Sequence, residues 1–472
     1  MANIVVRHYL PKKKGGATME KTIAAISTGS APGGIGVIRI SGSKAIEIAD
    51  SVFRAFDGSS LTSLKGYRAK YGSIVIDGES TDNAVALIFR APKSYTGEDV
   101  AELSVHGGML LVQKTLDAVL AAGAEPAQAG EFTKRAFLNG KIDLTQAESV
   151  AELISAQGEQ SLKASYNALQ GALSRKINAV LDKLLDSSAL MAAWVDYPDE
   201  EIPELSDSEL TKTLEFCAYE LSALLEGYDG GQTVTKGVVT AIAGRPNAGK
   251  SSLMNMLSRR DKSIVTHIEG TTRDIVEGDV TLGGIVLHLL DTAGLRESDD
   301  VVEAIGIEKA HKAIDSAQLV LAVFDSSIPL GAEDFALMEE CKGKTAIAVI
   351  NKNDLESVID SAQVERAFEK TVYISAKNDE GLEELSETVK SVLGVSNFDT
   401  TAPLLANLRQ KKNCENALNY IKEAQNTLGA GMTYDAVNVM IDAAAEELLS
   451  LTGKKATEEV VNNIFKNFCV GK

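Results

Sequence analysis

Up to about Gly140, the chain alternates apolar and polar positions in short runs, which is typical of half-buried β-strands. Four such runs are bounded by glycine or aspartate: GGIGVIRISG, YRAKYGSIVIDG, NAVALIFR and DVAELSVHGG. After the last of them, LLVQKTLDAVLAAG spaces its apolar residues as a helix does and ends in glycine. The pattern predicts an α+β domain over residues 1–140.

Helical periodicity then replaces this pattern over residues 141–194, until WVDYPDEEIP interrupts it. Thr145 and Glu148 have the spacing of a capping box, which predicts a helix start at this point. A further helix is expected over residues 206–226. The glycines of GYDGGQTVTKG, which follows, predict a linker.

Between residues 238 and 393, strand-length apolar runs such as LVLAVF and TAIAVI alternate with helical segments, which is typical of a doubly wound parallel sheet. Helical text then returns and runs to the end of the chain. Because helices flank the α/β unit on both sides, we predict a helical domain in two parts, residues 141–231 and 397–472. The α/β domain, residues 232–396, is inserted between them, as close domain termini allow.

The composition, 44% hydrophobic and 24% charged over 472 residues, is that of an ordinary globular protein. No apolar run approaches the roughly 18 residues of a membrane helix, and the N-terminus lacks the apolar core of a signal peptide. Two readings of the N-terminus stay open, a leader segment and a translation start at Met19. The four cysteines stand far apart without a CxxC pair, so we predict neither zinc nor disulfides, and a cytoplasmic location.

A phosphate-binding loop is predicted by GRPNAGKS, which has the G-x-x-x-x-G-K-S pattern and stands between a strand and a helix. Its glycines let backbone N–H groups turn toward phosphates, and the helix N-terminus adds positive potential. Lys250 would neutralise the β- and γ-phosphates during catalysis, and Ser251 would bind Mg²⁺. The predicted nucleotide contacts of this loop are Asn247, Ala248, Gly249, Lys250, Ser251 and Ser252.

Later motifs complete a nucleotide site of the switch type. GTTRD supplies Thr272 as a second Mg²⁺ ligand. DTAG follows a predicted strand and supplies Asp291 as a third ligand. The other residues of DTAG, Thr292, Ala293 and Gly294, are also expected to contact the nucleotide. The Gly294 amide would sense the γ-phosphate.

The base is predicted from NKND and SAK, which each follow an apolar strand. The Asp354 carboxylate can accept both guanine N1–H and N2–H, a pairing that adenine does not offer. The sequence therefore predicts a GTP-binding domain. The base-contacting residues expected from the two motifs are Asn351, Lys352, Asp354, Ser375, Ala376 and Lys377.

Further motifs lie outside this constellation: SYTGEDVAELSVHGG, GEFTKRAFLNGKIDLTQAE, DYPDEEI and the terminal FCVGK. With GGIGVIRISG, GRPNAGKSSLMN, GTTRD and DTAGLRES, they resemble the MnmE (TrmE) family of tRNA-modification GTPases over about residues 22–472. The phosphate-binding loop and GTTRD alone would also fit Era-like ribosome-assembly GTPases, but the N-terminal motifs and the tail would not. A ribosome-assembly switch and a folate enzyme regulated by GTP remain the alternatives.

The chain lacks the glutamine that orients the attacking water in Ras-like enzymes, because Leu295 follows DTAG at that position. The resemblance implies that K⁺ beside the phosphates does electrostatic work and that Glu303 orients the water. From the residues alone, Glu303 is one of several acids in RESDDVVEAIGIE, and a solvated helix position stays open. The implied K⁺ ligands are Asn247, Thr266, Ile268 and Thr271, in a loop that also brings His267, Glu269 and Gly270 to the nucleotide.

The resemblance also implies that the N-terminal domain binds a 5-formyl- or methylene-tetrahydrofolate. A carboxylate suits the neighbouring N–H donors of a pterin, and cations suit its glutamyl tail. The matching residues are Arg39, Glu102, Lys141 and Lys472. Cys469, in the tail, is a candidate nucleophile or general acid, and a free surface thiol is the alternative.

The function implied by the resemblance is K⁺-dependent GTP hydrolysis coupled to tRNA modification. A homodimer would act with an FAD-containing flavoprotein partner, MnmG in the family, and would install an aminomethyl-type or carboxymethylaminomethyl group at C5 of the wobble uridine. The formal net charge of −19 argues against a broad basic surface for nucleic acid. The partner is therefore expected to carry much of the tRNA affinity.

Overall fold

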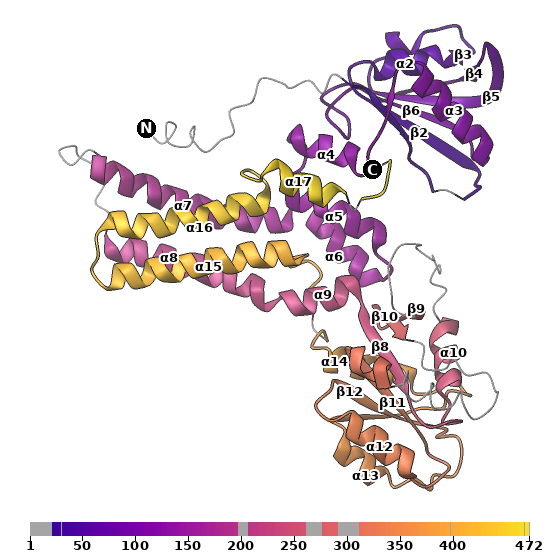
Figure 1. The fold of residues 1–472 in the computed structure, drawn as a ribbon, viewed down its shortest axis with the longest axis vertical. Helices are drawn as coiled ribbons and strands as arrows, with labels where there is room; N and C mark the ends of the chain where they lie inside the picture. The colour runs from indigo at the N-terminus through magenta and orange to yellow at the C-terminus, as the bar shows by residue number, and fades with distance from the viewer. Residues whose placement is uncertain are drawn as a thin grey trace. The chain divides into compact units, whose positions relative to one another are not determined.

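Figure 1 shows the computed structural model, which describes residues 21–29, 31–196, 206–260, 276–290, 311–396, 398–466 and 468–471. The chain forms two compact units. Unit 1 is assembled from Met1–Ala151, Ala168–Leu225 and Leu408–Lys472, and unit 2 from Glu152–Asn167 and Glu226–Asn407. The chain thus leaves unit 1 and later returns to it, as an inserted domain requires.

A seven-stranded sheet forms the N-terminal part of unit 1, in the order β3-β4-β5-β6-β2-β1-β7. All neighbouring strands are antiparallel except β1 and β7, which are parallel. The four predicted strands are confirmed as β2, β4, β5 and β6, and three short strands join them. The bounds are β1 (Ile23–Ile26), β2 (Ile35–Ser41), β3 (Phe53–Ala55), β4 (Arg68–Ile76), β5 (Glu79–Phe89), β6 (Val100–His106) and β7 (Glu125–Pro126).

The two faces of this sheet have different roles. Ile38, Ile40 and Leu103 are fully buried in a core shared with helices on one face. Because side chains alternate along a strand, Arg39 and Glu102 lie on the opposite face, where they are direct cross-strand neighbours of β2 and β6. The helices of this part are α2 (Ala45–Ser51), η1 (Leu61–Ser63), α3 (Met109–Ala121) and α4 (Glu131–Leu138).

The rest of unit 1 is a helical bundle, in which α16 packs against both α7 and α15. Buried apolar residues of α8 recur every three or four positions, which is the stripe expected of a bundle helix. The prediction of helices on both sides of the insertion is confirmed. Their bounds are α5 (Leu144–Ser155), α7 (Ala172–Asp196), α8 (Asp207–Glu226), α15 (Leu408–Gly429), α16 (Tyr434–Thr452) and α17 (Glu458–Phe465).

The predicted capping box at the start of the helical part is wrong by two residues. The reciprocal pair is Asp143 and Gln146: the Gln146 N–H donates to Asp143 Oδ1 (3.0 Å), and the Asp143 N–H donates to Gln146 Oε1 (3.1 Å). Glu148 instead accepts two hydrogen bonds from Arg409, at 2.7 and 3.0 Å. Asp143, one residue before α5, has the position that a cap requires, and Thr145 lies inside the helix.

The predicted glycine-rich linker is also wrong, because GYDGGQTVTKG forms the helix α9 (Tyr228–Lys236). Gly230 and Gly231 lie against the side chains of Phe398 and Leu404, where a Cβ atom on Gly230 would be 3.3 Å from the Phe398 ring. Tertiary packing thus outweighs the low helix propensity of glycine. With α6 (Glu159–Leu169), α9 connects the inserted domain to the remainder of the chain.

The inserted domain is a six-stranded sheet in the order β13-β12-β11-β8-β10-β9, parallel except at the edge strand β9. Every residue of β11 is buried, as expected for a strand covered on both faces. Within the part of the chain that is described, no helix is long and apolar enough to cross a membrane. The elements are β8 (Val238–Ala243), α10 (Lys250–Arg260), β9 (Val276–Leu282), β10 (Ile285–Leu290), β11 (Leu319–Asp325), α12 (Ala332–Glu340), β12 (Ala346–Asn351), α13 (Ser361–Ala367), β13 (Lys370–Tyr373) and α14 (Leu382–Val392).

Candidate functional site

The phosphate-binding loop runs from the end of β8 to the start of α10, as predicted. Two left-handed residues turn it: Asn247 has φ +61° and Gly249 has φ +98°. The Lys250 ammonium donates to the carbonyl oxygens of Gly244 (2.7 Å) and Arg245 (2.9 Å), so it lies over the loop. Partial burial lowers the pKa of Lys250, and the charge of Glu333 opposes this shift. A phosphate in the loop would offer this cation a stronger, charge-assisted partner.

Asn351 joins the phosphate-binding loop to the base-recognition loop. Its buried side chain donates from Nδ2 to the Ala248 carbonyl (3.0 Å) and accepts at Oδ1 from the Ala376 N–H (3.0 Å). A Cβ atom at position 249 would lie 2.0 Å from Asn351 Nδ2, so only glycine fits there. Three predicted motifs are thus tied together by one amide, and NKND and SAK meet at the carboxyl ends of β12 and β13.

Asp354 has the setting that guanine recognition requires. The Ser375 hydroxyl donates to Asp354 Oδ1 (2.7 Å), and this hydrogen bond is the main cause that lowers the pKa of Asp354. The exposed carboxylate is therefore ionised at neutral pH and accepts hydrogen bonds only. Lys377, at the end of SAK, is exposed as well, and its positive charge also lowers the pKa of Asp354.

Asp325 is a residue that sequence reasoning missed. Its carboxylate accepts a hydrogen bond from Lys352 Nζ (2.5 Å), and the Ser326 hydroxyl donates to the Lys352 carbonyl (2.8 Å). Lys352 itself has φ +65°, so this pairing fastens a strained residue of NKND to the end of β11. Asp325 is the last residue of the buried strand β11, just as Asn351 of NKND is the last residue of the neighbouring strand β12. This shared position at a strand end is the signal that could have identified Asp325.

Several predicted nucleotide, metal and catalytic residues lie outside the described residues. They are Thr266, His267, Ile268, Glu269, Gly270, Thr271, Thr272, Asp291, Thr292, Ala293, Gly294 and Glu303. Lys472 of the predicted folate set lies outside as well. Of the predicted Mg²⁺ ligands, Ser251 is described, and it lies exposed in the first turn of α10.

A second cluster forms where the C-terminal tail reaches the N-terminal sheet. Arg39 Nε donates to Glu102 Oε1 (2.8 Å), and Arg39 Nη1 reaches the Gly471 carbonyl (3.5 Å). The same carbonyl accepts from the Ser27 hydroxyl (3.1 Å). The Gly130 N–H donates to the carbonyl of Cys469 (3.3 Å), so the tail is held at two points. The structure therefore brings Arg39 and Glu102 together with the tail segment that carries Cys469.

Aromatic rings complete this second cluster. The Arg39 guanidinium carbon lies 5.6 Å from the ring centre of Tyr95 and 5.7 Å from that of Phe132. The Tyr95 hydroxyl is hydrogen-bonded to Thr133 of α4 (2.8 Å). Sequence reasoning missed both rings, although they stand in the quoted motifs SYTGED and GEF. Lys141 is exposed, and its ammonium donates to the carbonyl of Pro92 (3.0 Å).

Cys469 differs from the other three cysteines. Cys217, Cys341 and Cys414 are buried, and burial raises the pKa of each thiol to about 12. They are protonated and shielded, which is typical of structural cysteines. Cys469 is exposed, so among the cysteines it is the one that solvent and ligands can reach.

A parallel sheet whose strand ends carry a P-loop, an NKND segment and an SAK segment defines a P-loop GTPase. The family model "MnmE helical domain" matches residues 144–469, and "GTP-binding protein TrmE N-terminus" matches residues 22–141. The tRNA modification GTPase MnmE of Symbiobacterium thermophilum is 41% identical over 96% of this chain and 100% of its own length. The chain belongs to the MnmE family of tRNA modification GTPases.

Two further matches cover different shares of the chain. The tRNA modification GTPase MnmE of Clostridioides difficile is 38% identical over 96% of this chain and 100% of its own length. The G domain of the T. maritima FeoB iron transporter is 29% identical, covers 33% of this chain and 98% of that chain, and has a TM-score of 0.26. Family membership makes the chain a GTP hydrolase, and it decides against the ribosome-assembly alternative.

Proposed function

We propose that this chain couples K⁺-promoted GTP hydrolysis to modification of C5 in the wobble uridine of certain tRNAs. In this proposal it acts as a homodimer with a flavoprotein partner of the MnmG type and uses a tetrahydrofolate one-carbon unit. The observation that carries the proposal is the cluster on β2 and β6, where Arg39, Glu102 and the tail carrying Cys469 meet. The nucleotide site alone would fit many GTPases. The cluster on β2 and β6 is a separate site, and in this proposal it binds a second ligand.

The residues of the cluster fit a reduced folate. Glu102 is a half-buried carboxylate, which suits the adjacent N–H donors of a pterin, and Arg39 holds it in place. The partly exposed ring of Tyr95 offers apolar surface beside the Arg39 guanidinium, and the buried ring of Phe132 packs near the same guanidinium. Lys141 is exposed and can turn its ammonium toward the glutamyl tail. When bound, the folate supplies the one-carbon unit, and the chain's own residues bind and orient it.

The GTP part of the proposal assigns each described residue one task. Lys250 and the loop amides hold the phosphates, Ser251 binds Mg²⁺, and Asp354 selects guanine. Asn247 is the described member of the proposed K⁺ set, and its left-handed backbone is part of the loop's turn. Glu303 orients the attacking water in place of the glutamine that Leu295 replaces. GTP hydrolysis then drives conformational change rather than the carbon chemistry.

The test is a mass-spectrometric nucleoside profile of tRNA from cells that lack this gene. C5-modified wobble uridines should disappear, and the wild-type gene should restore them. A gene carrying Glu303→Gln should not, although the purified variant should bind GTP as tightly as the wild type. An unchanged profile in cells without a redundant enzyme would refute the tRNA role and leave the GTPase assignment standing.

The K⁺ part has a test of its own. GTP hydrolysis by the purified chain should be faster in K⁺ than in Na⁺ at equal ionic strength, because the proposed loop must fit the larger ion. Substitution Asn247→Ala should remove the difference between the two salts. Equal rates in K⁺ and Na⁺ for the wild type would overturn this part.

A further inference from the structure

The β9–β10 hairpin lies between the two segments that the sequence predicts to sense the nucleotide. β9 begins two residues after Asp274 of GTTRD, and β10 ends directly before Asp291 of DTAG. Its turn, Gly283 and Gly284, has φ values of +63° and +85°, as a tight two-residue hairpin loop requires. Both segments are therefore continuous in the chain with one hairpin.

The hairpin touches the connecting helices α6 and α9 through backbone. A Cβ atom on Gly158, directly before α6, would lie 2.9 Å from the Gly284 carbonyl oxygen. A Cβ atom on Gly237, directly after α9, would lie 2.6 Å from the Val286 carbonyl oxygen. Both positions accept only glycine, so the hairpin and the ends of the two helices are fitted closely together.

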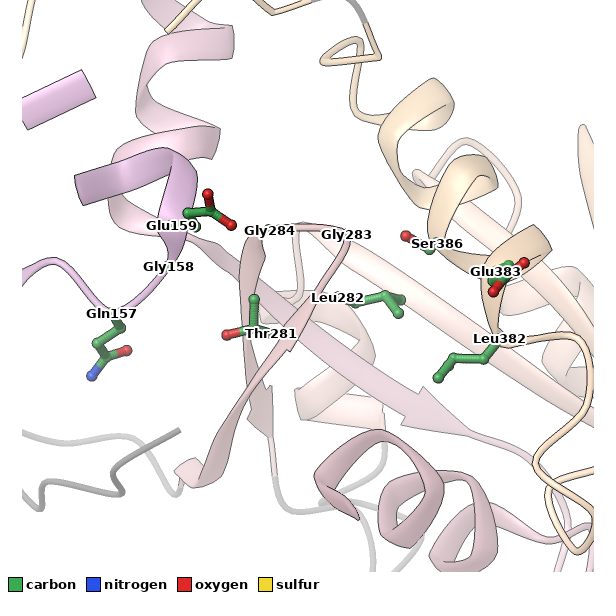
Figure 2. A pocket seen from close by; sticks show the side chains of 10 residues that line it. All are labelled: Gln157, Gly158, Glu159, Thr281, Leu282, Gly283, Gly284, Leu382, Glu383 and Ser386. Carbon is green, nitrogen blue, oxygen red and sulfur yellow. The ribbon is translucent and has the colours of Figure 1, made fainter. Parts of the chain in front are cut away.

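A cavity of about 390 Å³ opens beside the hairpin turn. Figure 2 shows the turn between the residues that precede α6 and those of α14, with Glu159 on one side and Ser386 on the other. None of the residues that line it belongs to the phosphate-binding or guanine-recognition loops described above. Leu282 and Ile285, which flank the turn in the sequence, are buried in the apolar core of the domain, so the polar contacts of the hairpin add to this apolar packing.

His288, on β10, makes polar contacts through both of its ring nitrogens. Its Nδ1 lies 2.7 Å from Asp279 Oδ1 on β9, and its Nε2 lies 2.7 Å from the Lys236 carbonyl oxygen at the end of α9. A carbonyl and a carboxylate both accept, so both ring nitrogens must donate. A neutral imidazole has one N–H and would leave one of the two contacts unmade. The geometry therefore requires the imidazolium.

The surroundings of this imidazole favour its charge. The hydrogen bond to Asp279 raises the pKa of His288, and partial burial opposes that effect. The same bond is the main cause that lowers the pKa of Asp279, to which Gln157 also donates from the segment before α6. The groups that face the ring are thus Asp279 from β9 and the Lys236 carbonyl from α9, with Gln157 behind the carboxylate.

We propose that His288 is a positioning residue of the GTPase cycle. As an imidazolium it locks the β9–β10 hairpin to the C-terminal end of α9, so that nucleotide-dependent displacement of the hairpin reaches the connecting helices. The proposal rests on GTP hydrolysis alone and does not depend on the tRNA, folate or K⁺ proposals. Loss of the lock should leave nucleotide binding intact and uncouple α6 and α9 from it.

Hydrogen exchange measured by mass spectrometry on the full chain tests this. The probes are Mg²⁺ with GDP and Mg²⁺ with a non-hydrolysable GTP analogue. In the wild type, the two nucleotides should give different exchange in peptides from α6, α9 and α10. In His288→Gln, the α10 difference should remain, the α6 and α9 differences should fall at least about fivefold, and analogue affinity should stay within about twofold.

Three further variants sharpen the test. Asp279→Asn removes the charged acceptor and should behave as His288→Gln does. His288→Arg keeps two donors and a fixed charge, so it should restore the response and make it independent of pH between 6 and 9, whereas the wild-type response should decline over that range. His311→Gln is the matched control, because His311 forms a comparable contact, from Nδ1 to Glu340 (2.5 Å), in the same domain but outside β9, β10 and α9.

Three results would overturn the proposal. The first is a His288→Gln variant whose α6 and α9 peptides still respond to the nucleotide. The second is a variant that loses analogue affinity and the α10 response together, because that would make His288 a structural residue of the fold. The third is a wild type in which α6 and α9 do not respond at all.

Discussion

The guanine-recognition loops and the tail cluster are built in opposite ways. The guanine-recognition residues lie at or just after the ends of two neighbouring parallel strands: Asn351, Asp354 and Ser375. Their mutual contacts join residues at most 25 positions apart in the sequence, and only the contact of Asn351 with Ala248 spans more. The tail cluster joins Arg39 to Gly471, which are 432 positions apart. One site is a consequence of strand order within a sheet, and the other depends on the chain's end reaching a distant face.

The two sites should therefore fail differently. The amide of Asn351 is buried and joined to two loops, so damage to it disturbs the whole nucleotide site. The tail is held by a few hydrogen bonds to its backbone, and chain ends held in this way open locally at low free-energy cost. We expect all-or-none effects at the first site and graded effects at the second.

The largest expected effect follows from Asp354→Asn. It replaces one acceptor by a donor facing guanine N1–H and N2–H, and hydrogen bonds to charged groups contribute about 1.5–3 kcal/mol each. GTP affinity should fall roughly a hundredfold. Xanthosine triphosphate, which carries an oxygen in place of the 2-amino group, should bind better to the variant than GTP does. Titration calorimetry with both nucleotides measures this.

Asp360→Asn is the matched control for that prediction. Asp360 caps α13, accepting from the Gln363 N–H (3.3 Å), and takes no part in the base-recognition loops. GTP affinity should be unchanged in this variant. If Asp354→Asn kept its preference for GTP, guanine recognition through this carboxylate would be wrong, and the tail cluster would be the better-supported site.

The difference between the sites also explains what could be predicted from the sequence. Asn351, Asp354 and Lys250 were identified because each motif stands directly beside an apolar strand, and the strands bring them together. The contact between Arg39 and the tail has no local pattern, so only family resemblance pointed to it. The errors have the same origin: the helix α9 and the cap at Asp143 depend on packing and on neighbouring side chains that a motif does not report.

A smaller effect is expected from Arg39→Met, which removes the cation but keeps much of the apolar length. Glu102 would lose its partner, and 5-formyltetrahydrofolate should bind about tenfold more weakly. GTP affinity should not change, because the nucleotide loops share no residue with this cluster. Fluorescence titration with each ligand compares the two sites in one preparation.

Arg54→Met controls for a general loss of positive charge. Arg54 is exposed on β3 of the same sheet, away from β2 and β6 in the strand order. It should bind folate as the wild type does. Equal losses in the two variants would mean that net charge, rather than the Arg39–Glu102 pair, attracts the folate.

The attachment of the tail can be weakened without touching any proposed ligand. Gly130 has φ +63°, and a Cβ atom there would lie 2.8 Å from Phe468 Cβ. Gly130→Ala should lower the free energy of unfolding by about 1–2 kcal/mol and make the tail more accessible to carboxypeptidase. Gly140→Ala is the control, since Gly140 has φ +68° but no atom within 4 Å of the added Cβ.

Both alanine variants introduce backbone strain at a positive φ. The difference between their free energies of unfolding therefore measures the contact with the tail. Urea titrations of the wild type and both variants measure it. Gly130→Ala should be the less stable of the two and should bind 5-formyltetrahydrofolate less tightly. Equal stability and equal folate affinity in both would mean that the docked tail contributes nothing to the cluster.

The smallest expected effect is a pH dependence confined to the inserted domain. The pKa of His288 is raised by Asp279, so the imidazolium contacts stabilise the fold fully below the ordinary pKa of 6.5 and are lost as pH rises through the raised pKa. Thermal unfolding of the nucleotide-bound chain should therefore shift to lower temperature between pH 6 and 9, and His288→Gln should flatten that shift. His288 takes no part in the Arg39–Glu102 cluster, so folate affinity should not follow the same curve. A folate affinity that declined in parallel with the unfolding temperature would show that the two sites are coupled, against the independence that their construction predicts.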